Sequence, residues 1–168
     1  MKFYSQSKTQ KLTMSAMVMA LYIVILYATQ SFSFGPYQIR IATALYALGY
    51  FCPFLIVPLG LANFISNLLF GGLGPLDMIG GCAVGMLSTG CAALIRKLHV
   101  SQWLVFFPIV LIPGFGVSIW LSYLLHISYK ALALSLCIGQ TVPAVCGVML
   151  IRLLERYQNT TIGKEPVK

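Results

Sequence analysis

The sequence predicts an all-α membrane protein, a single integral domain of six transmembrane helices with its N- and C-termini in the cytoplasm. Composition is the first observation behind this prediction, because 59% of the 168 residues are hydrophobic and only 8% are charged. A water-soluble domain keeps about a quarter of its residues charged. Between Lys11 and Arg96, charge is carried by Arg40 and Asp77 alone. The chain therefore lacks a polar surface and is expected to be solvated by lipid.

The lengths of the apolar runs are the second observation. A helix needs about 20 residues to cross a hydrocarbon core of about 30 Å, and the first run covers residues 12–32. Its basic flank resembles a signal peptide, but no small-x-small cleavage site follows, so we expect a retained anchor. Pro53 and Pro58 predict a tight hairpin between the short second and third helices. Proline and glycine divide the rest into helices over about 41–55, 56–70, 75–98, 102–125 and 128–156, with polar tails at 1–11 and 157–168.

The distribution of basic residues is the third observation. Six spans place the two termini, the turn between the second and third helices and the loop near Ser101 on one side. That side receives Lys2, Lys8, Lys11, Arg96, Lys97, Arg152, Arg156, Lys164 and Lys168, whereas the other receives Arg40 and Lys130. Such an excess of Lys and Arg marks the cytoplasmic side.

Several function classes find no support in the sequence. The basic residues are scattered at membrane borders, where they contact lipid headgroups, so no nucleic-acid partner is expected. Metal sites and cofactors are not expected, because the cysteines lie in apolar helices without C-x-x-C spacing and His99 and His126 fall on opposite sides. No catalytic motif, Walker motif or pair of carboxylates within the membrane is present, so the chain is not expected to be an enzyme or a self-powered pump.

Small residues four apart mark three of the predicted helices. Ala16 and Ala20 lie on one face of the first helix, Gly81 and Gly85 on the fourth, and the sixth carries Ala131, Ser135, Gly139, Pro143 and Gly147. Such faces allow close approach of another backbone. We expect the small residues of the fourth and sixth helices to serve packing within the bundle. The first helix is otherwise rich in large apolar residues, so its small patch is a candidate surface for a partner.

Polar residues at the outer ends of the predicted helices form a candidate binding site. Gln38 and Arg40 enter the second helix after a turn at Gly35-Pro36 and offer donors, and Tyr37 offers a ring. An alternative is that Arg40 extends toward lipid phosphates. Asn63 and Asn67 are one turn apart and share a face. Asp77 begins the fourth helix, where it could cap the helix end, pair with Arg40 or share a ligand pocket with it. The full set of expected ligand contacts is Tyr37, Gln38, Arg40, Thr43, Asn67, Asp77, Trp120 and Gln140.

These residues resemble a known family. Ala16-x-x-x-Ala20, Gln38-x-Arg40 before Ala44-Leu45, and Asn67-Leu-Leu before Asp77 and Gly81 are similar to the QueT-type queuosine-precursor transporters. These are S-components, the substrate-binding membrane subunits of energy-coupling factor (ECF) transporters, a class of ABC transporter. The resemblance implies an S-component-like bundle in the bacterial plasma membrane. It also implies that a T-component and two cytoplasmic ATPases power uptake, with Ala16 and Ala20 as the docking face.

The substrate implied is a vitamin-like micronutrient, either a queuosine precursor of the 7-deazaguanine type or another vitamin such as cobalamin. The chain departs from the family pattern where Ala42-Thr43 replaces a Ser-Glu pair and Gly139-Gln140 replaces a Gly-Glu pair. Carboxylates suit the N–H edge of a guanine-like base, so the transporter class is better supported than this ligand. The alternatives are a small self-sufficient transporter or channel that works as an oligomer, and a structural membrane subunit without a ligand.

Overall fold

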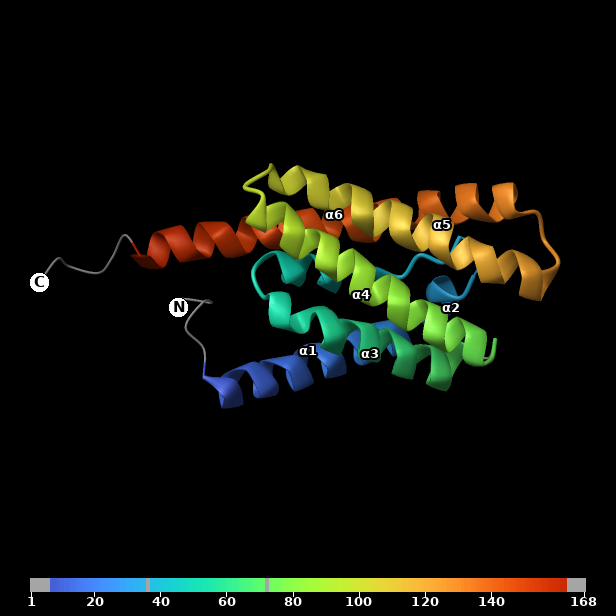
Figure 1. The fold of residues 1–168 in the computed structure, drawn as a ribbon, viewed down its shortest axis with the longest axis horizontal. Helices are drawn as coiled ribbons and strands as arrows, with labels where there is room; N and C mark the ends of the chain where they lie inside the picture. The colour runs from blue at the N-terminus through green and yellow to red at the C-terminus, as the bar shows by residue number, and fades with distance from the viewer. Residues whose placement is uncertain (1–6, 36, 72, 163–168) are drawn as a thin grey trace, which may run out of the picture.

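The computed structural model describes residues 7–35, 37–71 and 73–162, which form helices and connecting turns without any strand (Figure 1). Pro36 of the expected Gly35-Pro36 turn lies outside these residues. The basic residues Lys2, Lys164 and Lys168 also lie outside them. In chain order the elements are α1 (Lys8–Ala28), α2 (Gln30–Ser33), η1 (Ile41–Tyr50), η2 (Pro53–Leu55), α3 (Ile56–Ser66), η3 (Asn67–Gly71), α4 (Pro75–Lys97), η4 (Gln102–Val105), α5 (Phe106–Leu125) and α6 (Tyr129–Ile162).

Five segments are long and apolar enough to span a membrane. They are Lys8–Ala28, Pro53–Gly71, Pro75–Lys97, Gln102–Leu125 and Tyr129–Gln158, and Ile41–Tyr50 is a shorter apolar helix. This confirms the predicted class, an all-helical membrane bundle. Two boundaries differ from those expected. The first helix divides at Thr29, whose hydroxyl donates to the Ile25 carbonyl, and the second and third helices separate at residues 51–52.

The second helix also differs in kind, because η1 is a 3₁₀ helix of ten residues. A 3₁₀ helix rises about 2.0 Å per residue against about 1.5 Å for an α-helix, so η1 covers roughly 20 Å rather than 15 Å. Eight of its residues are buried, most of them small or aromatic. The short helix therefore reaches farther through the centre of the bundle, where α4 and α6 pack against it.

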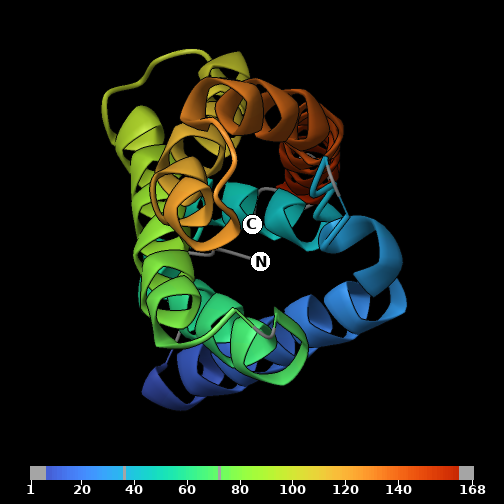
Figure 2. The ribbon, with the colours of Figure 1, turned by 90° about the vertical axis from the view of Figure 1, so that its right-hand side faces the viewer.

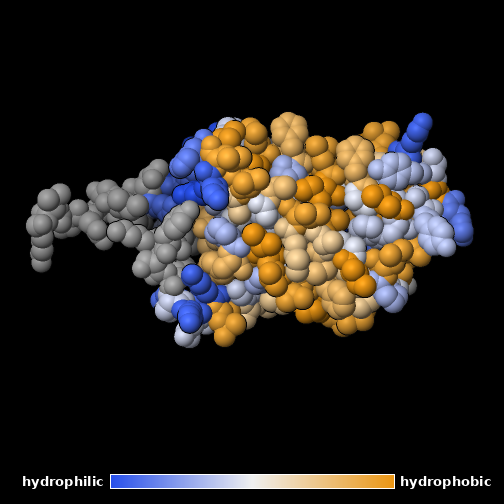
Figure 3. All heavy atoms as spheres, in the orientation of Figure 1, coloured by the Kyte–Doolittle hydropathy of each residue, from blue (hydrophilic) through white to orange (hydrophobic). Residues whose placement is uncertain are grey.

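The bundle has two distinct ends. Helix α1 begins and α6 ends at the same end, together with the η1–η2 corner and the α4–η4 loop (Figure 1). We call this the basic end, because the start of α1, the end of α4 and the C-terminal half of α6 carry most of the described basic residues, namely Lys8, Lys11, Arg96, Lys97, Arg152 and Arg156. The opposite end, viewed in Figure 2, holds α2, the α3–α4 connection and the α5–α6 turn. Figure 3 shows a hydrophobic belt over the middle and the densest hydrophilic surface at the basic end.

Most of the buried apolar residues form one core that joins α1, η1, α3, α5 and α6. Its fully buried members include Tyr22, Tyr46, Leu55, Ile109 and Ile151. A smaller apolar cluster around Leu121 and Leu136 lies between α4, α5 and α6, with Trp120 packed against it. These clusters hold η1 and α3 against α6 and α4, and that arrangement positions the polar residues described next.

Candidate substrate-binding site

Arg40 lies at the centre of a buried polar cluster. It immediately precedes η1, is 4% exposed, and donates from Nη1 to the side-chain oxygens of Asn63 at 3.2 Å and Asn67 at 3.0 Å. Its Nε donates to the Ser33 carbonyl at 3.4 Å, and its guanidinium lies 4.8 Å from the Phe34 ring centre. The alternative that Arg40 extends to lipid phosphates is therefore wrong, because amides, a carbonyl and a ring surround its charge.

The two asparagines share a face, as their spacing predicts, and both are almost fully buried. Asn63 Nδ2 donates to the Tyr46 hydroxyl at 2.9 Å and to the Gly81 carbonyl at 2.8 Å. Asn67 Nδ2 donates to the main-chain carbonyl of Asp77 at 2.9 Å. A Cβ at Gly81 would collide with the Asn67 amide. The small residue at position 81 thus allows α4 to approach the amides that hold Arg40.

The cluster extends to α1 through two tyrosines. The hydroxyls of Tyr22 and Tyr46 are 3.0 Å apart, and their rings stack with centres 5.8 Å apart. Both side chains are fully buried. The sequence analysis did not single out either tyrosine, although a tyrosine within an apolar helix usually finds a partner for its hydroxyl. That signal, combined with Asn63, could have pointed to the contact.

Thr43, Gln140 and Gln38 form a second branch of the cluster. The Thr43 hydroxyl lies 2.8 Å from Gln140 Oε1, and Gln140 Nε2 donates to the Gln38 carbonyl at 3.1 Å. Gln38 has a φ of 43°, a left-handed conformation that is costly for residues other than glycine and persists only where neighbours hold it. Gln140 supplies such a contact, so α6 fixes the path of the chain between α2 and η1.

Asp77 contributes a buried carboxylate to the same end. It is 1% exposed, Trp120 donates from Nε1 to its Oδ1 at 3.0 Å, and its Oδ2 has no partner among residues 7–35, 37–71 and 73–162. Asp77 does not cap α4, whose N-cap residue is Gly74 and which has no side-chain cap bond. The possible ion pair with Arg40 is also absent from the described part of the chain. Asn67 connects the two residues instead, because it accepts from the Arg40 guanidinium and donates to the main-chain carbonyl of Asp77.

Two cavities adjoin this cluster. A cavity of about 10 Å³ lies among Arg40, Thr43, Asn63 and Gln140, which is room for about one water molecule. A second cavity of about 540 Å³ lies at the end opposite the basic end, between Phe34, Gly35, Gln38, Gly71 and the facing parts of α5 and α6. Gln38 and Leu136 line both. These two residues therefore border both the larger cavity and the small cavity beside Arg40.

Most of the residues expected to contact ligand come together. Six of them, Gln38, Arg40, Thr43, Asn67, Asp77 and Gln140, are buried, and Trp120 joins them through Asp77. Tyr37 does not, because its side chain is 55% exposed and lines neither cavity. Phe34 and Ser33 were missed. Ser33 is the last residue of α2 and contacts Arg40 through its carbonyl, and Phe34 follows it and contacts Arg40 through its ring. No spacing pattern in the sequence connects this short helix to Arg40.

No metal-binding arrangement accompanies the cluster. Within the described ranges, no group of three or more His, Cys, Asp and Glu side chains lies together. All five cysteines are free. Burial raises the pKa of the Cys52 thiol to about 11, so that thiol is neutral at physiological pH and packs as a small apolar group.

Comparison with known proteins agrees with these observations. The family model described as QueT transporter matches residues 12–156, which include every residue of the cluster. The chain belongs to the QueT transporter family. It is accordingly a multi-pass membrane transport protein, as its long apolar helices also indicate. Neither the search of curated proteins nor that of solved structures returned a match.

The small-residue faces of this QueT-family chain differ in their surroundings. Ala16 and Ala20 are exposed on α1. On α4, Gly85 lies against Gly60 of α3, and on α6 Gly139 and Gly147 lie against the carbonyls of Tyr37 and Ala44. The faces of α4 and α6 therefore serve packing within the bundle, as expected, whereas Ala16 and Ala20 on the face of α1 stay exposed among the described residues.

Proposed function

We propose that this chain is the substrate-binding S-component of an ECF transporter. It takes up a vitamin-like micronutrient, first of all a queuosine precursor of the 7-deazaguanine type, with another vitamin such as cobalamin as the alternative. The ligand enters from the end opposite the basic end, which faces the outside of the bacterial cell. A T-component and two cytoplasmic ATPases supply the energy. Membership of the QueT transporter family supports the transport function, and the finer assignments rest on the site.

The observation that carries the proposal is the buried Arg40, which lines a small cavity that shares Gln38 and Leu136 with a cavity of ligand size. Ligand pockets for small molecules typically have volumes of about 300–1,000 Å³. The cavity of about 540 Å³ at the end opposite the basic end, which we call the outer cavity, falls in this range. Arg40 has amide and carbonyl partners but no carboxylate within ion-pair distance among the described residues. A cation buried without a counter-ion is costly, and a ligand carbonyl or anionic group would lower that cost.

Asp77 provides a complementary acceptor. A Cβ built on Gly71 would lie 3.1 Å from Asp77 Oδ2, and Gly71 lines the outer cavity. The unpartnered oxygen therefore lies just behind the cavity wall. A buried acceptor without a donor costs about 1–3 kcal/mol, which an N–H group of a ligand would relieve. A guanine-like base offers a carbonyl acceptor and N–H donors on one edge, so Arg40 and Asp77 together suit such a base despite Thr43 and Gln140.

An external energy source fits the charges of the chain. Asp77 and Glu155 are the carboxylates of the described residues, and neither forms the pair of ionisable groups in mid-membrane that a proton-driven carrier normally uses. The exposed face at Ala16 and Ala20 offers a surface for close contact with another membrane helix. An oligomeric transporter or channel would use that face against a second copy, and a structural subunit would leave the outer cavity without a ligand.

Copurification separates these possibilities. The tagged chain is produced in its native host, and the membrane complex is analysed for protein partners and for small molecules by mass spectrometry. We expect a T-component, two ATPases and a ligand that contains a 7-deazaguanine ring. A homo-oligomer that transports without ATPases would refute the S-component assignment. A different bound vitamin would refute the ligand and leave the transporter class in place.

Calorimetric titration of the identified ligand then tests the site. We expect Arg40→Ala to weaken binding at least about tenfold, equivalent to about 1.4 kcal/mol, while the protein still inserts and stays monodisperse. Lys130→Ala is the matched control, because Lys130 is an exposed basic residue in the first turn of α6, and α6 begins at the end that holds the outer cavity (Figure 1). Equal affinities of the Arg40→Ala variant and the wild type would place the ligand elsewhere.

A further inference from the structure

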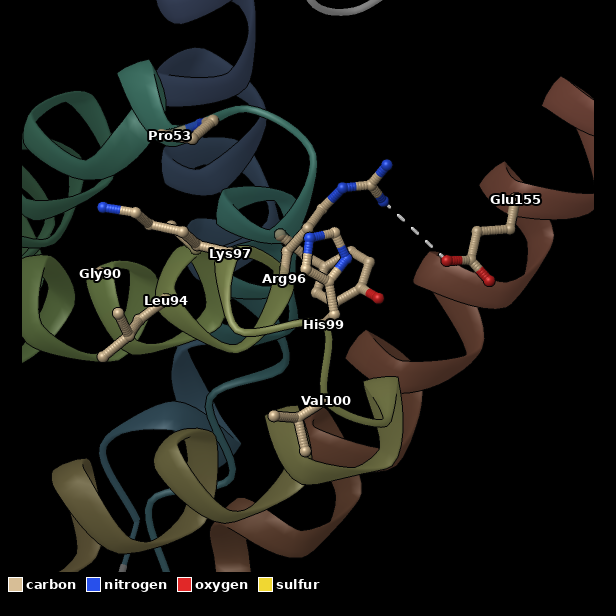
Figure 4. Close-up of a pocket in the computed structure, with 10 residues that line it drawn as sticks. Pro53, Gly90, Leu94, Arg96, Lys97, His99, Val100 and Glu155 are labelled. Carbon is tan, nitrogen blue, oxygen red and sulfur yellow. Dashed lines mark ion pairs between the residues drawn. The ribbon is translucent and has the colours of Figure 1, made fainter.

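A further cavity lies away from the polar cluster, at the basic end. It has a volume of about 800 Å³ and lies between the C-terminal part of α4, the η1–η2 corner and α6 (Figure 4). We call it the basic-end groove. The proposed transport function assigns no role to it, and its residues are chemically unlike those around Arg40.

The floor of the groove is a single face of α4. Gly90, Ala93, Leu94 and Lys97 all line it, and their spacing of three, four and seven residues places them on one side of a helix. Leu94 is 52% exposed. A Cβ built on Gly90 would meet no atom within 4 Å, so the floor is open at its deep end. From Lys97 to Gly90 the helix covers about 10 Å, an apolar path from the membrane surface toward its interior.

The rim of the groove is cationic. The Arg96 guanidinium lies 5.0 Å from the ring centre of Tyr50 and 4.8 Å from that of Phe51, and Nη1 is 4.0 Å from Glu155 Oε1. Figure 4 shows Arg96 reaching toward Glu155 on α6, whereas Lys97 extends away from it. Lys97 and His99 are exposed. Lys97 therefore supplies a positive charge that no carboxylate of the described residues neutralises.

The surrounding charges keep this end positive. A second groove of about 460 Å³ on the other side of Glu155 is lined by Arg152 and Arg156 of α6. Arg152 and Arg156 thus add two guanidiniums to this end of the bundle, beside the imidazole of His99 and the carboxylate of Glu155 at the basic-end groove. An anion at the rim is electrostatically favoured, and salt at physiological ionic strength screens charges only beyond about 8 Å.

We propose that the basic-end groove binds an anionic phospholipid. Its phosphate lies at the rim within reach of Lys97 and Arg96, and one acyl chain lies along the floor over Ala93 and Gly90. A free inorganic anion would use the rim alone and leave the apolar floor empty. The lipid uses both, and the floor lies where the hydrocarbon of the cytoplasmic leaflet begins if the basic end is cytoplasmic. Anionic lipids in that leaflet attract basic residues next to membrane spans.

Native mass spectrometry of the full chain in detergent micelles tests this proposal. The probes are phosphatidylglycerol and phosphatidylcholine with the same acyl chains. We expect higher occupancy with phosphatidylglycerol and a decrease of about fivefold in its affinity for Lys97→Gln, equivalent to about 1 kcal/mol. Lys130→Gln removes the same charge at the opposite end and should leave the affinity unchanged.

A second variant tests the floor without disturbing the rim. Gly90→Leu fills open space, so we expect an unchanged unfolding temperature and weaker binding of phosphatidylglycerol. Equal occupancy by the two lipids, or equal affinities of Lys97→Gln and Lys130→Gln, would refute the site. Displacement of phosphatidylglycerol by inorganic phosphate, with no effect of Gly90→Leu, would show a free-phosphate site instead. Loss of partner assembly in Lys97→Gln with lipid affinity unchanged would show a protein interface and would also refute it.

Discussion

Helices α1 and α6 carry the same sequence signal and use it differently. Both have small residues spaced by four residues or a multiple of four, Ala16 and Ala20 on α1 and Gly139 and Gly147 on α6. On α6 these residues are buried, and the carbonyls of Tyr37 and Ala44 occupy the space where side chains would be. On α1 they are exposed. A small-residue face shows that a backbone can come close, and only the fold shows whether that backbone belongs to the same chain.

The small-residue faces of α6 and α1 also differ in their relation to the polar cluster. The α6 face holds the segment around Gln38 in place and, through Gln140, supports the polar cluster. The α1 face is exposed, and Ala16 and Ala20 take no part in the polar cluster. Mutations at the two faces should therefore affect different measurements, and the following predictions run from the largest expected effect to the smallest.

Ala20→Trp should abolish uptake and leave ligand binding to the isolated chain unchanged. An indole on this face holds a partner helix several ångströms away, and close backbone contact is what small residues four apart provide. Uptake by cells that contain the partner subunits is the measurement, with ligand titration of the purified variant beside it.

The control for this variant is Ile119→Trp on α5, where the native side chain is 65% exposed and the residues four positions away, Phe115 and Tyr123, are large. It should transport normally. Normal uptake by the Ala20→Trp variant would remove the docking role from α1 and with it the contrast between the two helices.

Gly139→Ala should destabilise the protein, because a Cβ at this position collides with the Tyr37 carbonyl. Overpacking of a tight contact typically costs about 1–3 kcal/mol. The displaced 37–38 segment should also weaken ligand binding. Thermal unfolding in detergent measures the first effect. Gly90→Ala is the control, since a Cβ there meets nothing within 4 Å, and an equal fall in unfolding temperature for both variants would contradict the assigned contact.

Asn67→Ala should weaken ligand binding at least about tenfold, equivalent to about 1.4 kcal/mol. The substitution removes an acceptor from Arg40 and a donor from the Asp77 carbonyl, so both charged residues of the site lose their common partner. Calorimetric titration measures the effect. Thr141→Ala on the exposed side of α6 is the control, because its hydroxyl bonds within its own helix. An unchanged affinity of the Asn67→Ala variant would separate Asn67 from the site.

Cysteine labelling determines which end of the bundle faces the cytoplasm, without any expected effect on uptake. In a cysteine-free background, Ser128→Cys at the α5–α6 turn should react with an impermeant maleimide on intact cells, and Ser101→Cys at the α4–η4 loop should not. Both native serines are exposed, so access to the reagent reports sidedness. External labelling at position 101 would invert the topology and place the outer cavity in the cytoplasm.

The sequence by itself determined the class of the protein and much of the composition of the site. Low charge and long apolar runs dictate a helical membrane bundle, since each span must satisfy its own backbone hydrogen bonds in lipid. Polar residues are so costly in that setting that their presence alone marks Arg40, Asn67, Asp77 and Gln140 as candidates. The hairpin after η1 was likewise predictable, because proline at position 53 starts a helix readily and cannot continue one.

Only the tertiary structure decided how these residues interact. The 3₁₀ form of η1 is not visible in its periodicity, because it arises from packing between α4 and α6 that lets a short segment reach farther. The exposure of Tyr37, the link from Arg40 to Asp77 through Asn67 and the hydroxyl contact between Tyr22 and Tyr46 join positions far apart in the chain. Spacing along one helix tells which side chains share a face. Which face meets which neighbour depends on the volumes and shapes of all the helices packed together.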